Sequence, residues 1–112
     1  MDLLHKKCIP CEGGVKPFGV EEIKKYMPGI KGWMVLEGIK LHKEFTFEDL
    51  EQSMIFVNKV AEVAEHEKHH PDIFISYNRV RLTIWTHAIG GLSENDFILA
   101  AKIDNILEKE RG

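Results

Sequence analysis

Histidines gather in one short stretch, residues 64–70, where their types and spacing could support two different chemistries. His66-Glu67-Lys68-His69-His70 matches H-E-x-x-H, in which two histidines one helical turn apart bind zinc and the glutamate activates a water molecule. In the other interpretation the informative residues are His69-His70, which stand directly before Pro71. Histidine titrates near neutral pH, so several histidines in one pocket could transfer protons without a metal.

The zinc-protease interpretation makes demands that the surrounding sequence meets poorly. Its helix must stay regular through His70, yet a residue that precedes proline disfavours the helical conformation. It also needs a third ligand downstream, for which His87, Glu94 and Asp96 are the candidates. A protease must grip an extended peptide as well, and 112 residues leave little room for a second lobe. We therefore favour proton transfer, although spacing alone also allows each histidine to be a solvated or helix-capping residue.

The two cysteines, Cys8 and Cys11, form C-x-x-C with His5 close by. A structural zinc site normally takes four ligands, and only three candidates lie here. A thioredoxin-type redox motif should open a helix after a strand. Pro10 and the Glu-Gly-Gly run at residues 12–14 instead predict a loose arm. We expect a minor structural role for this segment, with a metal or redox site as the alternative.

The bulk composition is that of one soluble globular domain. The 112-residue chain is 44% hydrophobic and 29% charged, with a net charge of −3. The negative net charge argues against direct binding to nucleic acid, which usually needs a basic excess. No stretch reaches the roughly 20 apolar residues of a membrane span, and the start lacks the pattern of a signal peptide. We therefore expect a cytoplasmic protein that binds no membrane.

Three helices are predicted around the histidines. A short helix should cover residues 20–26, and a long amphipathic one should run from a capping box at Thr46–Asp49 to about His69. A second capping box at Ser93–Asp96 should begin the last helix. The predicted buried stripe of the long helix comprises Phe47, Leu50, Met54, Val57, Ala61 and Ala64, widened by Phe56, Val60 and Val63, and that of the last helix comprises Phe97, Ala100, Ile103 and Leu107.

Two strand pairs are predicted between these helices. Residues 32–47 should form two short strands around a turn at Glu37-Gly38, and residues 72–87 should form two more with a turn near Asn78-Arg79. In the fourth strand, Val80, Leu82 and Ile84 should face the helices, whereas Arg81 and Trp85 lie on the other face. Short connections favour antiparallel pairing, so the order predicts an α+β layer fold. The histidines would then lie at element ends, where active sites often form.

Three sequence motifs occur together in the second half of the chain. They are E-x-x-x-H-H-P at residues 65–71, Y-N-x-V-x-L-T-x-x-T-H at residues 77–87 and G-L-S-E-x-D at residues 91–96. Together they closely resemble the pterin-4a-carbinolamine dehydratase family, and Gly32-Trp33 and F-x-F-x-D at residues 45–49 fit the same pattern. The resemblance covers about residues 30–107. It implies that residues 1–19 are an N-terminal extension and residues 20–112 the dehydratase domain.

The resemblance implies a four-stranded antiparallel sheet with helices packed on one face, assembled as a homodimer or homotetramer. It implies dehydration of a 4a-hydroxytetrahydropterin to the quinonoid dihydropterin, the step that recycles tetrahydrobiopterin for aromatic amino-acid hydroxylases. It implies no metal and no organic cofactor. Vertebrate members also act as dimerisation cofactors of a homeodomain transcription factor, and the matched motifs carry no information on that role. A non-catalytic pterin-binding or dimerisation/coactivator module is therefore the alternative function.

The resemblance also implies roles for six residues. The catalytic histidines would be His69, His70 and His87, and the substrate-binding residues would be Asp96, Glu65 and Trp33. We expect His69 and His87 to transfer protons and His70 to position the pterin. Asp96 could equally stabilise the start of its helix, and Trp33 could equally pack in the core. We expect His66 to face solvent, and we assign no role to His42.

Overall fold

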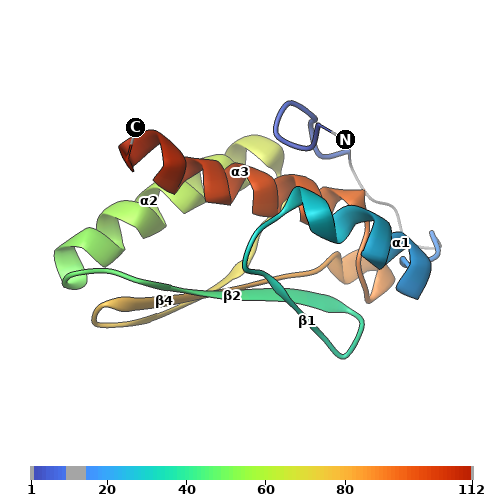
Figure 1. The fold of residues 1–112 in the computed structure, drawn as a ribbon, viewed down its shortest axis with the longest axis horizontal. Coiled ribbons are helices and arrows are strands. Elements are labelled where there is room, and N and C mark those ends of the chain that lie inside the picture. Colours follow the sequence, from blue (N-terminus) through green and yellow to red (C-terminus); the bar gives the residue numbers. More distant parts are fainter. Residues whose placement is uncertain (1, 10–14, 112) are drawn as a thin grey trace.

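The sheet confirms the four predicted strands and their antiparallel pairing. The computed structural model describes residues 2–9 and 15–111 (Figure 1). Its four strands are β1 (Met34–Leu36), β2 (Lys40–Thr46), β3 (Asp72–Ser76) and β4 (Arg79–Ile84). They pair antiparallel throughout, in the order β1-β2-β4-β3. Strands β2 and β4 are therefore the central pair, and β4 leads toward His87.

The helices gather on one face of this sheet, which confirms the α+β layer fold (Figure 1). They are α1 (Val20–Tyr26), α2 (Leu50–Glu67) and α3 (Glu94–Arg111), with short 3-10 helices η1 (Met27–Gly29) and η2 (His87–Ile89). The core lies between the layers, where Leu41, Val60 and Leu82 are fully buried. Among the described residues, none of the helices is both long and apolar enough to cross a membrane.

Both hairpin turns form close to where the sequence predicted them. Glu37 and Gly38 have φ values of 53° and 73°, the left-handed conformation that a tight two-residue turn requires. The β3–β4 turn carries its positive φ at Tyr77, one residue before the predicted position. In β4 the predicted alternation is confirmed, because Val80, Leu82 and Ile84 are completely buried and Arg81 is exposed.

The predicted start of α2 is wrong by several residues. Thr46 is the last residue of β2 and pairs with Arg79 of β4. The helix is capped by Asp49, whose carboxylate accepts a 2.9 Å hydrogen bond from the Gln52 N–H. Thr46 and Asp49 are both acceptable caps, and the pairing of Thr46 with β4 decides between them.

The predicted buried stripe of α2 is also partly wrong. Leu50 and Met54 are 47% and 38% exposed, and Ala61 is exposed as well. The buried residues of α2 are Ser53, Phe56, Val57, Val60, Ala64 and Glu67, so the prediction is confirmed at Phe56, Val57, Val60 and Ala64. The two polar residues on this face are stable there because they have hydrogen-bond partners: the Ser53 hydroxyl donates to the Asp49 carbonyl at 3.0 Å, and Glu67 meets Lys102.

In α3 the predicted stripe is confirmed at Phe97, Ala100 and Ile103, which are fully buried, while Leu107 is partly buried. Phe97 stacks with Phe18 and Tyr26, so α3 also anchors the chain around α1. This packing fixes the start of α3, and with it the residues that face the end of β4.

Candidate active site

Three element ends meet where the predicted histidines lie. Helix α2 ends at Glu67 because Lys68 adopts the left-handed conformation, with φ 56°. His69 and His70 follow on the connection to β3, and His87 follows β4. Thr86 pairs with Gly91 across the loop, its N–H donating to the Gly91 carbonyl at 2.9 Å. The loop thereby folds back to the first turn of α3.

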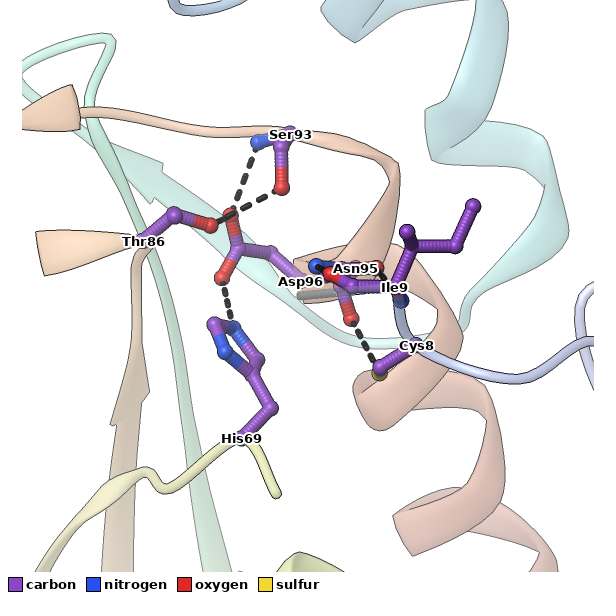
Figure 2. A network of polar contacts seen from close by, with 7 residues as sticks. All are labelled: Cys8, Ile9, His69, Thr86, Ser93, Asn95 and Asp96. Carbon is purple, nitrogen blue, oxygen red and sulfur yellow. Dashed lines mark hydrogen bonds and ion pairs between the residues drawn. The ribbon is translucent and has the colours of Figure 1, made fainter. Parts of the chain in front are cut away.

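A buried carboxylate holds His69 in place. The His69 Nε2 lies 2.6 Å from Asp96 Oδ1, and the side chains are 12% and 0% exposed. The other oxygen, Oδ2, accepts hydrogen bonds from the Thr86 hydroxyl at 2.9 Å and from the Ser93 N–H at 2.8 Å. Figure 2 shows these groups converging on Asp96. An ionised carboxylate can only accept hydrogen bonds, so we assign the proton between Oδ1 and Nε2 to the His69 Nε2.

The start of α3 forms half of the predicted capping box. Asp96 reaches back to the Ser93 N–H, as the third helical residue of such a box does. The Ser93 hydroxyl instead pairs with the Thr86 hydroxyl at 2.8 Å. Asp96 therefore serves the helix start and His69 at once. Because it is fully buried, it is linked to the cavity through its hydrogen-bond partners His69 and Thr86.

His70 lies in a different environment from its neighbour. Its side chain is 58% exposed, and its Nε2 lies 3.3 Å from an oxygen of Glu65, whose side chain is 79% exposed. An exposed pair of this kind is screened by water and weakly held. Glu65 is therefore linked to the site through His70.

His87 is exposed and is oriented by an aromatic neighbour. Its ring centroid lies 4.1 Å from that of Trp85, with an angle of 31° between the ring planes. The Lys40 ammonium lies 4.3 Å from the Trp85 ring centroid. The ring contact limits the orientations that His87 can adopt, and the lysine adds positive charge nearby.

The three predicted catalytic histidines line one cavity of about 570 Å³. Its lining also includes Lys7, Cys8, Ile9, His66, Glu67, Lys68, Trp85, Thr86, Ala88 and Asn95. A volume of this size suits a small-molecule ligand. His66 is 69% exposed at the side chain, which confirms its predicted exposure.

Trp33 does not line this cavity. It is buried, and its Nε1 donates to the carboxylate of Asp104 at 3.1 Å. Lys43 binds the same carboxylate at 2.8 Å. These contacts give Trp33 a role in the core, and its role in substrate binding stays a prediction.

The expectation of a loose N-terminal arm is wrong for residues 2–9, which dock on α2 and α3. Leu3 is 3% exposed, and the Cys8 N–H donates to Glu67 Oε1 at 2.9 Å. The Asn95 side chain bonds both backbone groups of Ile9, at 2.9 and 2.6 Å. Cys11 lies outside the described residues, so the C-x-x-C alternatives stay predictions.

Docking perturbs two ionisable groups in opposite directions. Burial alone would raise the pKa of the Glu67 carboxyl, but hydrogen bonds from the Cys8 N–H, Lys102 and His66 outweigh it and lower the pKa to about 2. Burial, followed by the charge of Glu67, raises the pKa of the Cys8 thiol to about 12. Glu67 is thus an ionised acceptor at neutral pH, and Cys8 is a protonated, unreactive thiol.

The helix that the zinc motif requires is interrupted. His66 belongs to α2 but His70 lies beyond the left-handed Lys68, so the two do not lie one turn apart on a helical face. Within residues 2–9 and 15–111, no three His, Cys, Asp or Glu side chains gather closely enough to hold a metal ion.

Sequence reasoning missed the residues that support the cavity. Glu67 belongs to the zinc motif alone and Thr86 is one letter of the second family motif, whereas Asn95 falls at the unspecified position of G-L-S-E-x-D. Their partners lie far away in the chain: Glu67 contacts Cys8 across 59 positions, and Asn95 contacts Ile9 across 86. The one local signal was that Glu67 falls on the buried side of α2, where an ionised group needs a partner.

Comparisons with known proteins agree with the fold and the motifs. Residues 16–106 match the family described as pterin 4 alpha carbinolamine dehydratase. The chain is 50% identical over 107 residues to a protein of Nitrosospira multiformis named as a candidate pterin-4-alpha-carbinolamine dehydratase, covering 96% of this chain and 94% of that one. A similarly named protein of Rubrobacter xylanophilus is 41% identical over 105 residues, covering 94% and 98%.

Two solved structures are similar as well. A transcriptional coactivator/pterin dehydratase from Brucella melitensis has a TM-score of 0.76 at 30% identity, over 81% of this chain and 98% of that one. A pterin dehydratase-like protein identified as a RuBisCO assembly factor has a TM-score of 0.59 at 22% identity, over 70% and 92%, and shows the fold alone. The family match and the near full-length relatives show that this chain belongs to the pterin-4a-carbinolamine dehydratase family of hydro-lyases.

Proposed function

We propose that this protein dehydrates a 4a-hydroxytetrahydropterin to the quinonoid dihydropterin. The observation that carries the proposal is the cavity lined by three histidines, one of which is held by a buried carboxylate. The names of the relatives support the same substrate class.

The reaction needs one proton donor and one proton acceptor. The C4a–O bond breaks and the hydroxyl leaves as water after taking up a proton. The N5–H bond gives up a proton, and its electrons form the C4a=N5 double bond. No proton is gained or lost overall, so a protonated histidine and a neutral histidine can complete the reaction near neutral pH.

His69 is well suited to be one of these two groups. Asp96 holds its Nε2, which leaves Nδ1 as the nitrogen available to a substrate. The carboxylate also stabilises the imidazolium whenever His69 carries two protons, because the pair is shielded from water. Asp96 is thus a positioning residue, which acts through His69 and touches no substrate.

We assign the second proton transfer to His87. Its ring face packs against Trp85, so the ring edge that carries the two nitrogens remains available to a bound pterin. His70 would bind and orient the pterin, with Glu65 as its exposed partner. Which of His69 and His87 is the acid depends on the pose of the substrate.

The expected context is recycling of the pterin used by an aromatic amino-acid hydroxylase. We also propose a homodimer or homotetramer, because Phe74, which pairs with the exposed Arg81 on the sheet face opposite the helices, is itself 54% exposed. Light scattering at micromolar concentration tests this directly; a monomer would refute the proposed assembly.

The test of function is dehydration of a synthetic 4a-hydroxytetrahydropterin, followed by absorbance. We expect the protein to accelerate dehydration well above the uncatalysed rate, and a His69→Ala/His87→Ala double variant to abolish most of that acceleration. Binding of dihydrobiopterin without any acceleration would refute catalysis and favour the non-catalytic pterin-binding module.

A further inference from the structure

The N-terminal arm contributes part of the cavity lining. Lys7, Cys8 and Ile9 line the same cavity as the three histidines, although they lie about 60 positions or more before them in the chain. Ile9 is apolar and 68% exposed, and Lys7 is a cation that is also exposed. An exposed isoleucine beside polar catalytic groups offers apolar area to a flat ligand.

Asn95 fixes one end of this segment. Its side-chain oxygen accepts from the Ile9 N–H at 2.9 Å, and its side-chain nitrogen donates to the Ile9 carbonyl at 2.6 Å. The amide therefore satisfies both backbone groups of Ile9, as a neighbouring strand would (Figure 2). Asn95 is 8% exposed, so both bonds are largely shielded from water.

Glu67 fixes the preceding residue. Its Oε1 accepts from the Cys8 N–H at 2.9 Å, while its Oε2 meets Lys102 at 2.9 Å. The Glu67 side chain is 2% exposed. A charged, desolvated acceptor makes a stronger hydrogen bond than a neutral one. Both residues that hold the arm are also close in sequence to the site: Glu67 is two residues before His69, and Asn95 is next to Asp96.

We propose that residues 7–9 of the N-terminal arm form one wall of the pterin site, with Asn95 and Glu67 as the positioning residues that hold this wall. The inference rests on the proposed function for its ligand. The wall contacts bound pterin through Ile9 and Lys7, and it takes no part in proton transfer. Loss of the wall therefore weakens substrate binding and leaves the bound reaction unchanged.

Steady-state kinetics on paired variants provide the first test. Ile9→Ala and Lys7→Ala should each raise KM about three- to ten-fold with kcat within about two-fold. The matched controls are Val15→Ala, an exposed apolar residue, and Lys6→Ala, a neighbouring lysine that pairs with Glu94. Neither control residue lines the cavity, and both variants should keep the wild-type KM. Equal KM values in all four variants would contradict the proposal that residues 7–9 form a wall of the pterin site.

Labelling of the Cys8 thiol provides a second test that needs no turnover. In a Cys11→Ser background, Cys8 is the single thiol of the chain. The docked thiol should react slowly with an aromatic disulfide, because burial keeps it protonated. Asn95→Ala should raise the labelling rate about ten-fold or more by releasing Ile9. Saturating 7,8-dihydrobiopterin should slow labelling at least three-fold in the background protein.

The two tests separate this inference from the proposed function. An inactive protein in which dihydrobiopterin still slows Cys8 labelling would contradict the dehydratase activity and support the wall. An active protein in which neither dihydrobiopterin nor Asn95→Ala changes labelling would overturn the wall alone. Circular dichroism must first show that each variant is folded.

Discussion

His69 and His70 are adjacent in sequence but lie in opposite physical environments. His69 is 12% exposed and lies 2.6 Å from a carboxylate that is 0% exposed. His70 is 58% exposed and lies 3.3 Å from a carboxylate that is 79% exposed. Both pairs join an imidazole to a carboxylate, so burial and support account for most of the difference.

This contrast indicates that the two sides of the cavity have different roles. A buried, hydrogen-bonded ring keeps one tautomer and one orientation, which proton transfer requires. An exposed ring beside an exposed glutamate can adjust to a ligand, and the pair contributes at most about 1 kcal/mol. The anchored side of the cavity therefore suits chemistry, and the exposed side suits binding.

The largest effect should come from the proton-transfer pair. His69→Ala and His87→Ala should each lower kcat by about 10² to 10⁴, the usual size of an acid–base contribution. His66→Ala is the control: His66 lines the same cavity but has no proposed part in proton transfer, so kcat should stay near the wild-type value. The zinc interpretation orders the variants differently, with His66 vital and His69 dispensable. Full activity in His69→Ala, with the fold intact by circular dichroism, would end the dehydratase assignment.

Glu67 and Glu65 repeat the buried and exposed contrast on one helix. Glu67 has its pKa lowered from 4.5 to about 2, so its contribution to stability is present above pH 4.5 and is lost as the pH falls toward 2. A pKa lowered by this amount corresponds to a contribution to the free energy of unfolding of at most about 3 kcal/mol. Urea unfolding at pH 7 should show Glu67→Gln to be destabilised by up to that amount.

The pH dependence distinguishes the charge of Glu67 from its packing. The gap between wild type and Glu67→Gln should close between pH 4.5 and pH 2, the range of the lowered pKa. Glu65→Gln, the exposed control, should leave the free energy of unfolding unchanged at every pH. A gap that stays constant down to pH 2 would mean that packing alone is lost.

Asp96→Asn should lower kcat by about 10- to 100-fold with little change in KM, because the amide can no longer fix the Nε2–H tautomer of His69. Glu65→Gln should change kcat by less than about two-fold, since its partner is exposed. Comparable losses of kcat in the two variants would remove the distinction between the anchored and exposed sides.

His70→Ala should raise KM by about ten-fold and leave kcat within about three-fold, because its proposed task is to hold the pterin. The measurement is a full substrate titration beside His69→Ala. If kcat falls as far as in His69→Ala, then both neighbours transfer protons, and the difference in exposure does not report on their roles.

The smallest expected effect is that of a chelator. The interrupted helix separates His66 from His70, so incubation with EDTA should leave the dehydration rate within experimental error. A rate that falls with EDTA and returns with zinc would restore the metal-enzyme alternative.

The sequence alone was sufficient for features set by neighbouring residues. The Glu37-Gly38 turn, the alternating burial of β4 and the short helix α1 all formed as predicted, because backbone sterics and side-chain periodicity are local properties. The position of the histidines at element ends follows from the same local signals, since Pro71 predicts that the preceding helix ends before it and β4 runs toward His87. The structure ends α2 at Glu67, about two residues earlier than predicted, through the left-handed Lys68.

Only the tertiary structure decided the features that depend on partners distant in sequence. Thr46 joins β2 because it pairs with Arg79, and α2 buries Ser53 while Leu50 and Met54 stay exposed. Helical spacing allows all the predicted positions on one wide face, and packing decides which of them are buried.

The candidate active site also depends on partners that are distant in sequence. Asp96 reaches His69 across 27 positions, and Glu67 and Asn95 hold the N-terminal arm across 59 and 86. Each of these groups is polar and buried, so it is stable only where the fold brings it a partner. Sequence types and spacing therefore named the reactive histidines, whereas the burial that separates an anchored histidine from an exposed one arises from packing between distant segments.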